Sequence, residues 1–398
     1  MYSLLSGLSV IEASSFVASP TAGLYLAQMG AEVIRVDQIG GGPDFQRWPK
    51  AANGASLYWE NLNRAKKSVA LDLGRPEGRE LLQALVAETG QFITNFPVNG
   101  FLSHEVLAEK RPDLVTIRVM GTADGNPALD YTVNAAVGLP DLTGPGPEPV
   151  NHVLPAWDLL TGAYAAFAML AALHHRKANG QGQEVRIPLS DVAIGSGANL
   201  GMLAEVLTTG TNRARLGNTV YGAFGRDFLT ADNIRLIIMA ITRRQWTGLV
   251  NVLDIGTEIA AIESARNVSF ATDEGVRFEH RDALFPLVEN RVANRCYAEL
   301  KVALDANGCC YGPYQTMQQA AQDPILVGNN PVFNISANPS GVCYPAAGAI
   351  ASIPQLERQL ALAAPRLGQH TDEMLESILG LSPVAISMLH DKGVIARA

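Results

Sequence analysis

The sequence has 398 residues, of which 47% are hydrophobic and 17% are charged, so it is long enough for two globular domains and too apolar for a disordered chain. Its formal net charge of −8 argues against nucleic-acid binding, because phosphate recognition needs a basic face and no cluster of Lys and Arg stands out. No apolar run reaches the roughly 18–20 residues of a membrane helix, and the N-terminal residues show neither a basic leader nor a small-residue cleavage site, so we expect a cytoplasmic protein with no membrane partner.

Strand and helix patterns alternate over the first 200 residues. Helices are predicted at 20–29 and 76–86, and buried strands at 8–11, 31–36, 68–73, 91–95, 113–119 and 184–189. Strands separated by helices of about ten residues are typical of parallel pairing with crossovers. The sequence therefore predicts a large Rossmann-like α/β domain.

The patterns change in the second half of the chain. Residues 159–175 are apolar almost all round, which indicates a buried helix. The stretch 210–225 is rich in Thr, Asn, Arg and Gly and is predicted to be a long connection. A strand is then predicted at 235–240, and helical segments at 244–252, 281–305 and 371–379. We expect a large domain of residues 1–205 and 325–398, a smaller α+β domain at 225–320, and linkers at 206–224 and 321–324.

The cysteines and histidines do not indicate a metal site or a disulfide framework. The four cysteines are Cys296, Cys309, Cys310 and Cys343. Two of them are adjacent, and no CxxC or Cys/His ligand spacing is present. The neighbouring His174 and His175 point about 100° apart on a helix, so we expect no metal ion.

Asp158 is the residue that most suggests chemistry. It is the single carboxylate of an otherwise largely apolar stretch, 150–158, that leads into the predicted buried helix. An Asp at a helix start is favoured by the free N–H groups and the helix dipole, so one interpretation is a helix cap. The other is a nucleophile that attacks an acyl carbon and forms a mixed anhydride. The residues alone leave both interpretations open.

Five motifs in order resemble the class III coenzyme A transferases, the CaiB/BaiF family. They lie at residues 5–12, 26–37, 63–73, 158–183 and 365–372. This resemblance implies that Asp158 is the nucleophile and that coenzyme A is a thioester substrate rather than a permanently bound cofactor. Family members are interlocked dimers, so a homodimer is expected. The family does not bind its nucleotide through a GxGxxG motif, and none is needed here.

The resemblance also suggests where coenzyme A is bound. Its contacts are carried over to Val17, Ala18, Leu71, Asn95, Phe96, Pro97, Asp130 and Tyr131. Main-chain groups at Val17 and Ala18, and amides near the start of the Asp158 helix, would stabilise an oxyanion. Two positions that are often basic in formyl-CoA transferases are Gln38 and Ser103 here, so other residues must bind the phosphates. The candidates are Arg35, Arg47, Arg64, Lys66 and Lys67.

Finer features resemble one subgroup, the mesaconyl-CoA C1–C4 CoA transferases. The matching strings are 92–97, 130–134, 150–158 and 217–228, the last without the run of glycines found in the formyl-CoA branch. This subgroup moves coenzyme A between the two carboxyls of one unsaturated C5 dicarboxylate. We expect His152 and Arg226 to recognise the free carboxylate, although His152 fits a satisfied buried histidine equally well.

Three other functions remain open at this point. The first is intermolecular transfer between dicarboxylates, with succinyl-CoA for example as the donor. The second is an acyl-CoA racemase, which would use a His152/Asp158 pair to move an α-proton. The third is a non-catalytic acyl-CoA binding protein, which would gain nothing from a desolvated Asp158. Incubation with mesaconyl-C1-CoA and no added acid separates the first from intramolecular transfer.

Overall fold

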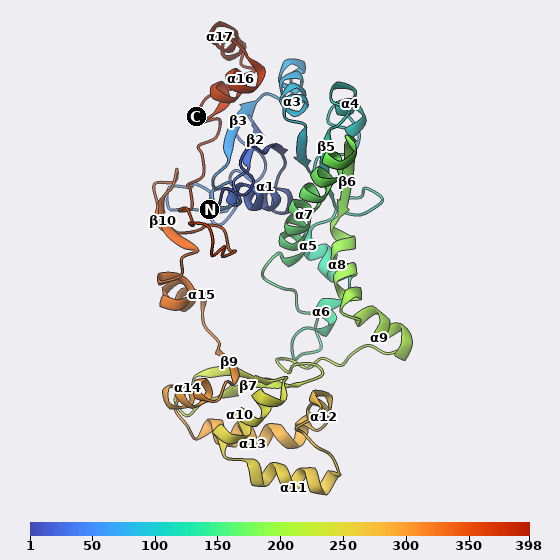
Figure 1. Ribbon diagram of the computed structural model, residues 1–398, viewed down its shortest axis with the longest axis vertical. Coiled ribbons are helices and arrows are strands. Elements are labelled where there is room, and N and C mark those ends of the chain that lie inside the picture. The colour runs from blue at the N-terminus through green and yellow to red at the C-terminus, as the bar shows by residue number, and fades with distance from the viewer. The chain divides into compact units, whose positions relative to one another are not determined.

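The computed structural model describes residues 1–398, and its contacts divide the chain into two compact units (Figure 1). The first comprises Met1–Val137, His152–Gly210 and Pro324–Ala398, and the second comprises Gly138–Asn151 and Thr211–Asp323. The segment 138–151 thus groups with the second unit, where the sequence had suggested the large domain. The reason is Arg215, whose guanidinium donates to the carbonyls of Gly146 and Glu148 and pairs with Asp141.

A seven-stranded sheet forms the centre of the first unit. Its order is β12 (Ile395–Ala396), β3 (Lys67–Leu71), β2 (Glu32–Gln38), β1 (Ser9–Ala13), β4 (Gln91–Thr94), β5 (Val115–Met120) and β6 (Gln183–Pro188). All neighbours pair in parallel except β12, which runs antiparallel to β3. The parallel α/β sheet predicted from the alternating strands and helices is therefore confirmed.

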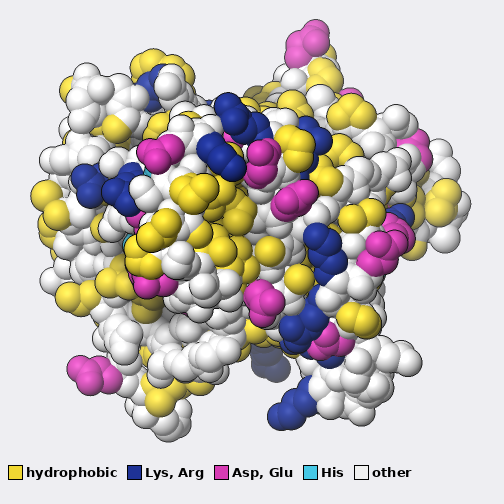
Figure 2. Space-filling model, turned by 90° about the horizontal axis from the view of Figure 1, so that it is seen from above, with side chains coloured by type: hydrophobic (Ala, Val, Ile, Leu, Met, Phe, Trp, Pro, Cys, Tyr) yellow, Lys and Arg dark blue, Asp and Glu magenta, His cyan; other side chains and the backbone are white.

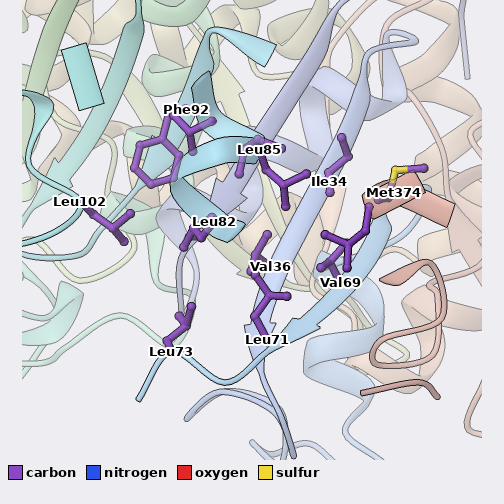
Figure 3. Close-up of a cluster of buried hydrophobic side chains, with 14 of the residues drawn as sticks. Ile34, Val36, Val69, Leu71, Leu73, Leu82, Leu85, Phe92, Leu102 and Met374 are labelled. Atoms are coloured by element: carbon purple, nitrogen blue, oxygen red, sulfur yellow. The ribbon is translucent and has the colours of Figure 1, made fainter. Parts of the chain in front are cut away.

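Helices cover both faces of this sheet. Successive strand residues point to opposite sides, and because both sets are apolar, each face must be buried. Ile11 and Phe92 belong to one buried cluster, and their neighbours Val10 and Ile93 belong to the other. Figure 3 shows the first cluster, in which the strand side chains meet α3 (Pro76–Thr89), α16 (Thr371–Leu379) and the loop at Leu102. Proline at the first position of α3 and the left-handed Gly90 after its last residue explain where that helix begins and ends.

The second face is covered by α1 (Ala18–Gln28) and α7 (Ala156–Asn179), which pack on each other and on the sheet. By length and composition alone, α7 is apolar enough to cross a membrane. Its inner face is fully used in the core, with Ala165 and Met169 at 0% exposure. Its outer face is exposed in the single chain, with Phe167 at 63%. The prediction of a helix is confirmed, but burial involves only one of its faces.

The other elements of the first unit are short. They are α2 (Leu57–Leu62), α4 (His104–Lys110), α5 (Asp130–Ala136), α8 (Leu189–Asn199), α9 (Met202–Thr209), the π-helical turn Pro324–Gly328, the hairpin β10 (Phe333–Ala337) and β11 (Cys343–Ala347), and α17 (Pro383–Asp391). The sequence had not indicated the hairpin, α17 or β12. A two-residue strand such as β12 has no periodicity to detect and exists only because β3 offers an edge.

The second unit has a three-stranded antiparallel sheet, β7 (Phe224–Leu229), β8 (Arg235–Ala240) and β9 (Cys310–Pro313). Its helices are α6 (Leu139–Leu142), α10 (Arg243–Leu253), α11 (Gly256–Arg266), α12 (Glu274–Glu279), α13 (Arg281–Ala293), α14 (Tyr297–Ala306) and α15 (Met317–Gln322). The single helical segment predicted at 281–305 is two helices. Cys296 is extended (φ −72°, ψ 146°) and its carbonyl accepts the first hydrogen bond of α14, so the chain turns there.

Figure 2 shows the molecule from the end that carries α3 and α17, and there Lys and Arg are interleaved with Asp and Glu. Ion pairs in this part of the chain agree with the picture. Lys67 pairs with Glu373, Arg75 with Asp72, and Arg397 with Asp372. This end of the molecule therefore has no field of a single sign.

Candidate active site

The predicted site residues gather at the carboxyl edge of the parallel sheet. After β3 the chain returns to place β4 beside β1, so the strand order reverses between β1 and β4, and ligands of open α/β sheets bind at such a point. Asn95, which follows β4, bridges this gap. Its side chain accepts from the Ser15 N–H at 3.1 Å and donates to the Ser15 carbonyl at 2.9 Å. Asn95 therefore fixes the loop after β1 instead of presenting a free amide.

The turn between β1 and α1 is held in an uncommon conformation. Phe16 has φ +69°, which is left-handed and unfavourable for a bulky residue, and its N–H donates to Asp44 Oδ2 at 3.1 Å. Val17 and Ala18 then begin α1, whose first-turn N–H groups have no partner inside the helix. The strained turn therefore leaves main-chain donors at the sheet edge.

Three of the five candidate phosphate ligands are buried and serve the fold instead. Arg35 pairs with Glu12 at 3.5 Å, Asp37 at 2.9 Å and Asp44 at 3.0 Å. Lys66 donates to Glu12 at 2.7 Å and to the Pro20 carbonyl at 2.9 Å, and burial lowers its pKa to about 8. Arg64 bonds Asn61 and Asn338. The expectation that these three bind phosphate was wrong, because a buried charge must be compensated within the protein. The remaining candidates have accessible surface, Arg47 without a partner and Lys67 beside Glu373.

The loop after β4 is shaped by a buried arginine that the sequence did not single out. Arg118 on β5 donates to the carbonyls of Phe96 at 2.7 Å, Pro97 at 2.9 Å and Leu102 at 2.8 Å, and pairs with Glu184. These bonds turn the carbonyls of the loop inward. Leu71, at the end of β3, is fully buried, so only main-chain atoms are presented there.

A carboxylate from another helix starts α7. Asp130 Oδ2 accepts the N–H groups of Trp157 at 2.7 Å and Asp158 at 3.0 Å, and Asp130 itself is only 2% exposed. The residue that precedes α7 is Pro155, which has no capping side chain. The interpretation of Asp158 as the helix cap was therefore wrong, and Asp130 supplies this function from α5.

The Asp158 carboxylate is left without a hydrogen-bond or ion-pair partner. Burial and, to a lesser extent, the nearby Asp130 charge raise the pKa of Asp158 to about 7, against the lowering effect of Arg47. Burial removes water from this carboxylate, and the like charge of Asp130 disfavours its ionised form. A carboxylate poised near neutral pH is a frequent property of functional sites.

A glycine brings the start of α7 against the start of α1. A Cβ atom at Gly162 would lie 2.6 Å from the Ala18 carbonyl and 2.6 Å from Thr21 Cβ, so only glycine permits this approach. Asp158 is one turn earlier on the same face of α7, since residues four apart are neighbours on a helix. The carboxylate of Asp158 and the free N–H groups of α1 thus belong to one site.

His152 and Tyr131 line the same region, and Arg226 lies in the other unit. The Nε2 atom of His152 is paired with Asp130 Oδ1, and the ring lies edge-on to Tyr131 at 5.6 Å. The Tyr131 hydroxyl donates to the Val153 carbonyl. Arg226 pairs with Glu289 at 3.2 Å and stacks on Phe228 and Phe285.

Several site residues carried no usable signal in the sequence. Asp44 and Arg118 are ordinary charged residues until the fold buries them beside the loops at the sheet edge. Tyr58 has a buried hydroxyl without a partner and is packed under Arg47, at 5.4 Å from the ring centroid. Buried, contact-dependent functions of this kind have no local pattern that spacing or periodicity can reveal.

Comparisons with known proteins agree on one family. The sequence model described as CoA-transferase family III matches residues 5–371. The chain is 42% identical to the 2-methylfumaryl-CoA isomerase of Chloroflexus aurantiacus, over 100% of this chain and 98% of that protein. It is 30% identical to the succinyl-CoA–D-citramalate CoA-transferase of the same organism, over 98% of each. A crystal structure of a CaiB/BaiF family protein from Brucella suis superposes with a TM-score of 0.76 and 26% identity, covering 95% of this chain and all of that one.

The desolvation of Asp158 predicts how stability depends on pH. The folded pKa lies above the usual 3.8, so the carboxyl costs the folded state progressively more as the pH rises from about 4 to about 7, and a constant amount above that. Asp158→Asn removes this cost. We expect its Tm to exceed that of the wild type by about 2–4 °C at pH 8 and by much less at pH 4. Scanning calorimetry from pH 4 to 8.5 measures the difference, and Asp391→Asn on the exposed end of α17 is the control. Equal Tm values at all pH values would contradict the desolvation.

Proposed function

Since the chain belongs to CoA-transferase family III, we propose that it moves coenzyme A from the C1 to the C4 carboxyl of mesaconyl-CoA, which is 2-methylfumaryl-CoA. The observation that carries this proposal is the end-to-end similarity to an isomerase of that substrate, well above the similarity to an intermolecular transferase. The unpartnered, desolvated Asp158 supports the chemistry. Acyl-CoA thioesters are the substrates of the family as a whole.

In the proposed reaction Asp158 is the nucleophile throughout. Its carboxylate attacks the C1 thioester carbon, the C–S bond breaks, and CoA thiolate leaves behind a mixed anhydride. The thiolate then attacks the Asp158 acyl carbon, which releases the free dicarboxylate and leaves CoA on the enzyme. The C4 carboxylate attacks this enzyme thioester, the C–S bond breaks, and CoA thiolate leaves a second anhydride. The thiolate finally attacks the C4 carbon, and the anhydride C–O bond to Asp158 breaks. Asp158 is regenerated as a carboxylate, and no net proton is consumed.

The surrounding groups have defined tasks in this proposal. The free N–H groups at Val17 and Ala18 stabilise the oxyanions that form on the attacked carbonyls. Asp130 positions Asp158 by accepting its N–H. Asn95, Phe96, Pro97 and the end of β3 at Leu71 shape the groove for coenzyme A, with Tyr131 at its border. Retention of the dicarboxylate between the two half-reactions makes the second transfer effectively intramolecular.

The two residues predicted to bind the free carboxylate, His152 and Arg226, differ in their contacts. Arg226 remains a proposed ligand of the free carboxylate, on a side chain that already pairs with Glu289. His152 has its Nε2 engaged with Asp130, which supports the interpretation of a satisfied histidine. A racemase would need His152 as a proton carrier, so this pairing also disfavours the racemase alternative.

We also propose a homodimer. The outer face of α7 exposes Leu160, Tyr164, Phe167 and Leu170, which are spaced as one helical stripe, and exposed apolar stripes of this kind mark protein interfaces. A second copy covers such a face most simply, since most soluble oligomers are symmetric homo-oligomers. The long connection at 210–223, which contains no helix or strand, is the segment that would permit interlocking.

The first prediction concerns the nucleophile. Asp158→Ala should lower transfer by at least about 10⁴-fold, because no other group can form the anhydride. The fold should persist, since Asp130 and not Asp158 caps α7. Hydroxylamine added with acyl-CoA should convert Asp158 of the wild type to a hydroxamate that peptide mass spectrometry locates. For the wild type, kcat/KM should rise with pH up to about 7, where the carboxyl ionises. Turnover retained by the alanine variant would rule out the mechanism.

The second prediction separates intramolecular from intermolecular transfer. Mesaconyl-C1-CoA should convert to the C4 isomer with no acceptor acid present. An excess of ¹³C-labelled free mesaconate should enter the thioester much more slowly than isomerisation proceeds, because the acid stays in the pocket. Mass spectrometry of the CoA esters measures both rates. Label that appears as fast as the isomer forms would favour an intermolecular dicarboxylate transferase instead.

The third prediction concerns assembly. Light scattering at micromolar concentration should give twice the chain mass of 42.4 kDa. Phe167→Glu should weaken the dimer by placing a charge in the apolar stripe of α7. Val384→Glu, at an equally exposed apolar position on α17, should not. A wild-type protein that is monomeric under these conditions contradicts the proposal.

A further inference from the structure

We propose that Arg47 binds the carboxylate of the dicarboxylate that is not reacting, and so makes the enzyme specific for dicarboxylyl thioesters. This inference rests on the function proposed above and names the residue that selects its substrate class. Arg47 had been considered only as one of several candidate phosphate ligands. Its surroundings in the folded chain point to a different partner.

The backbone at Arg47 is held in place by the buried cluster beneath it. Asp44 is fixed by Arg35 at 3.0 Å and in turn fixes the Phe16 N–H. The Arg47 N–H donates to the Asp44 carbonyl at 3.1 Å, and the Ser56 hydroxyl donates to the Arg47 carbonyl at 2.6 Å. The main chain of Arg47 is therefore fixed by hydrogen bonds, although its side chain is accessible to solvent.

The guanidinium is positioned by two aromatic rings and not by a carboxylate. Its carbon lies 5.4 Å from the ring centroid of Phe16 and 5.4 Å from that of Tyr58. No Asp or Glu pairs with it, whereas the buried cations Arg35 and Lys66 both have acidic partners. The hydroxyl of Tyr58, one of these two rings, is buried and also lacks a partner. An unpaired cation next to an unsatisfied donor is the arrangement expected of a site that awaits an anion.

The anion must lie near Asp158. The Arg47 guanidinium stacks on Phe16, which directly precedes Val17 and Ala18. A Cβ atom at Gly162, one turn after Asp158 on α7, would lie 2.6 Å from the Ala18 carbonyl, so the start of α1 joins the two side chains. In agreement with this geometry, Arg47 opposes the upward shift of the Asp158 pKa. In a bound thioester the reacting carbon is at Asp158. The phosphates of coenzyme A are separated from it by the whole pantetheine arm, whereas the second carboxyl of mesaconate is only three carbon–carbon bonds away. A cation at this position therefore reaches the carboxylate and not the phosphates.

One cation is sufficient for both halves of the proposed reaction. The two carboxyls of a trans-butenedioate point in opposite directions along one axis. When C1 is bound to Asp158, the C4 carboxylate points away from it, toward Arg47. After the acid turns end for end, the C1 carboxylate takes that place and C4 reaches the reacting position. The same charge thus holds the released acid in the pocket between the two transfers.

The test compares mesaconyl-C1-CoA with tiglyl-CoA, in which a methyl group replaces the free carboxylate at the same geometry. The rate of CoA release in the presence of hydroxylamine measures only the first attack by Asp158, for both thioesters. In Arg47→Met the ratio of kcat/KM for mesaconyl-CoA to that for tiglyl-CoA should fall roughly 30- to 100-fold, since a charge-assisted hydrogen bond is lost only with the dicarboxylate. Arg47→Lys should recover part of the ratio. Arg281→Met, which removes an arginine stacked on Phe278 in the second unit, is the matched control and should leave the ratio unchanged.

Two results would overturn the inference. An equal loss on both thioesters would mean that Arg47 acts on Asp158 or on the fold. A matching loss of affinity for free coenzyme A, measured by calorimetry, would mean that Arg47 binds a phosphate. Failure of the proposed isomerisation is distinguishable from both, because it would appear as CoA release without formation of the C4 thioester by the wild type. The substrate comparison is valid in that case too.

Discussion

Buried charge pairing beneath the carboxyl edge of the sheet is the constraint on which the site depends. Arg35 on β2 and Lys66 just before β3 both pair with Glu12. Through Asp44 and the Pro20 carbonyl they hold the loop after β2 and the first turn of α1. Burial of so many charges is costly and is repaid only when each has its partners. This buried cluster is rigid, and the strained turn at Phe16 persists because Asp44 of the cluster accepts its N–H.

A contact between two helices explains why the Asp158 carboxylate has no partner. A helix start needs acceptors for its free N–H groups, and a residue that supplies its own acceptor has no free carboxylate. Asp130 takes over this task from a neighbouring helix. Asp158 is then half-buried, unpaired and close to a like charge, which is unfavourable for stability and suits the proposed nucleophile. The desolvated Asp158 destabilises the folded state, whereas the hydrogen bonds that Asp130 accepts at the start of α7 stabilise it.

The cations of the site divide into two kinds that look alike in the sequence. Arg35, Lys66 and Arg118 are satisfied within the protein and shape loops through carbonyls and carboxylates. Arg47 is the exception, because aromatic rings position it and no carboxylate neutralises it. The lack of a compensating carboxylate, and not charge itself, therefore distinguishes the proposed substrate ligand Arg47 from the structural cations at this sheet edge.

The sequence by itself determined the regular part of the molecule and the family. Strands such as Ser9–Ala13 and Glu32–Gln38 follow from local apolar runs between helices, and the motif around Asp158 from a short ordered string of residues. Local patterns did not determine the break at Cys296 or the strand Ile395–Ala396, because the chain there depends on distant partners, Asp232 for Tyr297 and the edge of β3 for the strand. The hairpin at 333–347 pairs neighbouring segments, and the sequence analysis missed it as well. Only the tertiary structure decided that Asp130 caps α7, that Arg35 and Lys66 are buried, and that Arg47 is unpaired. Burial and partnership are properties of contacts between distant residues, and they set the charge state of a side chain and the ligands available to it.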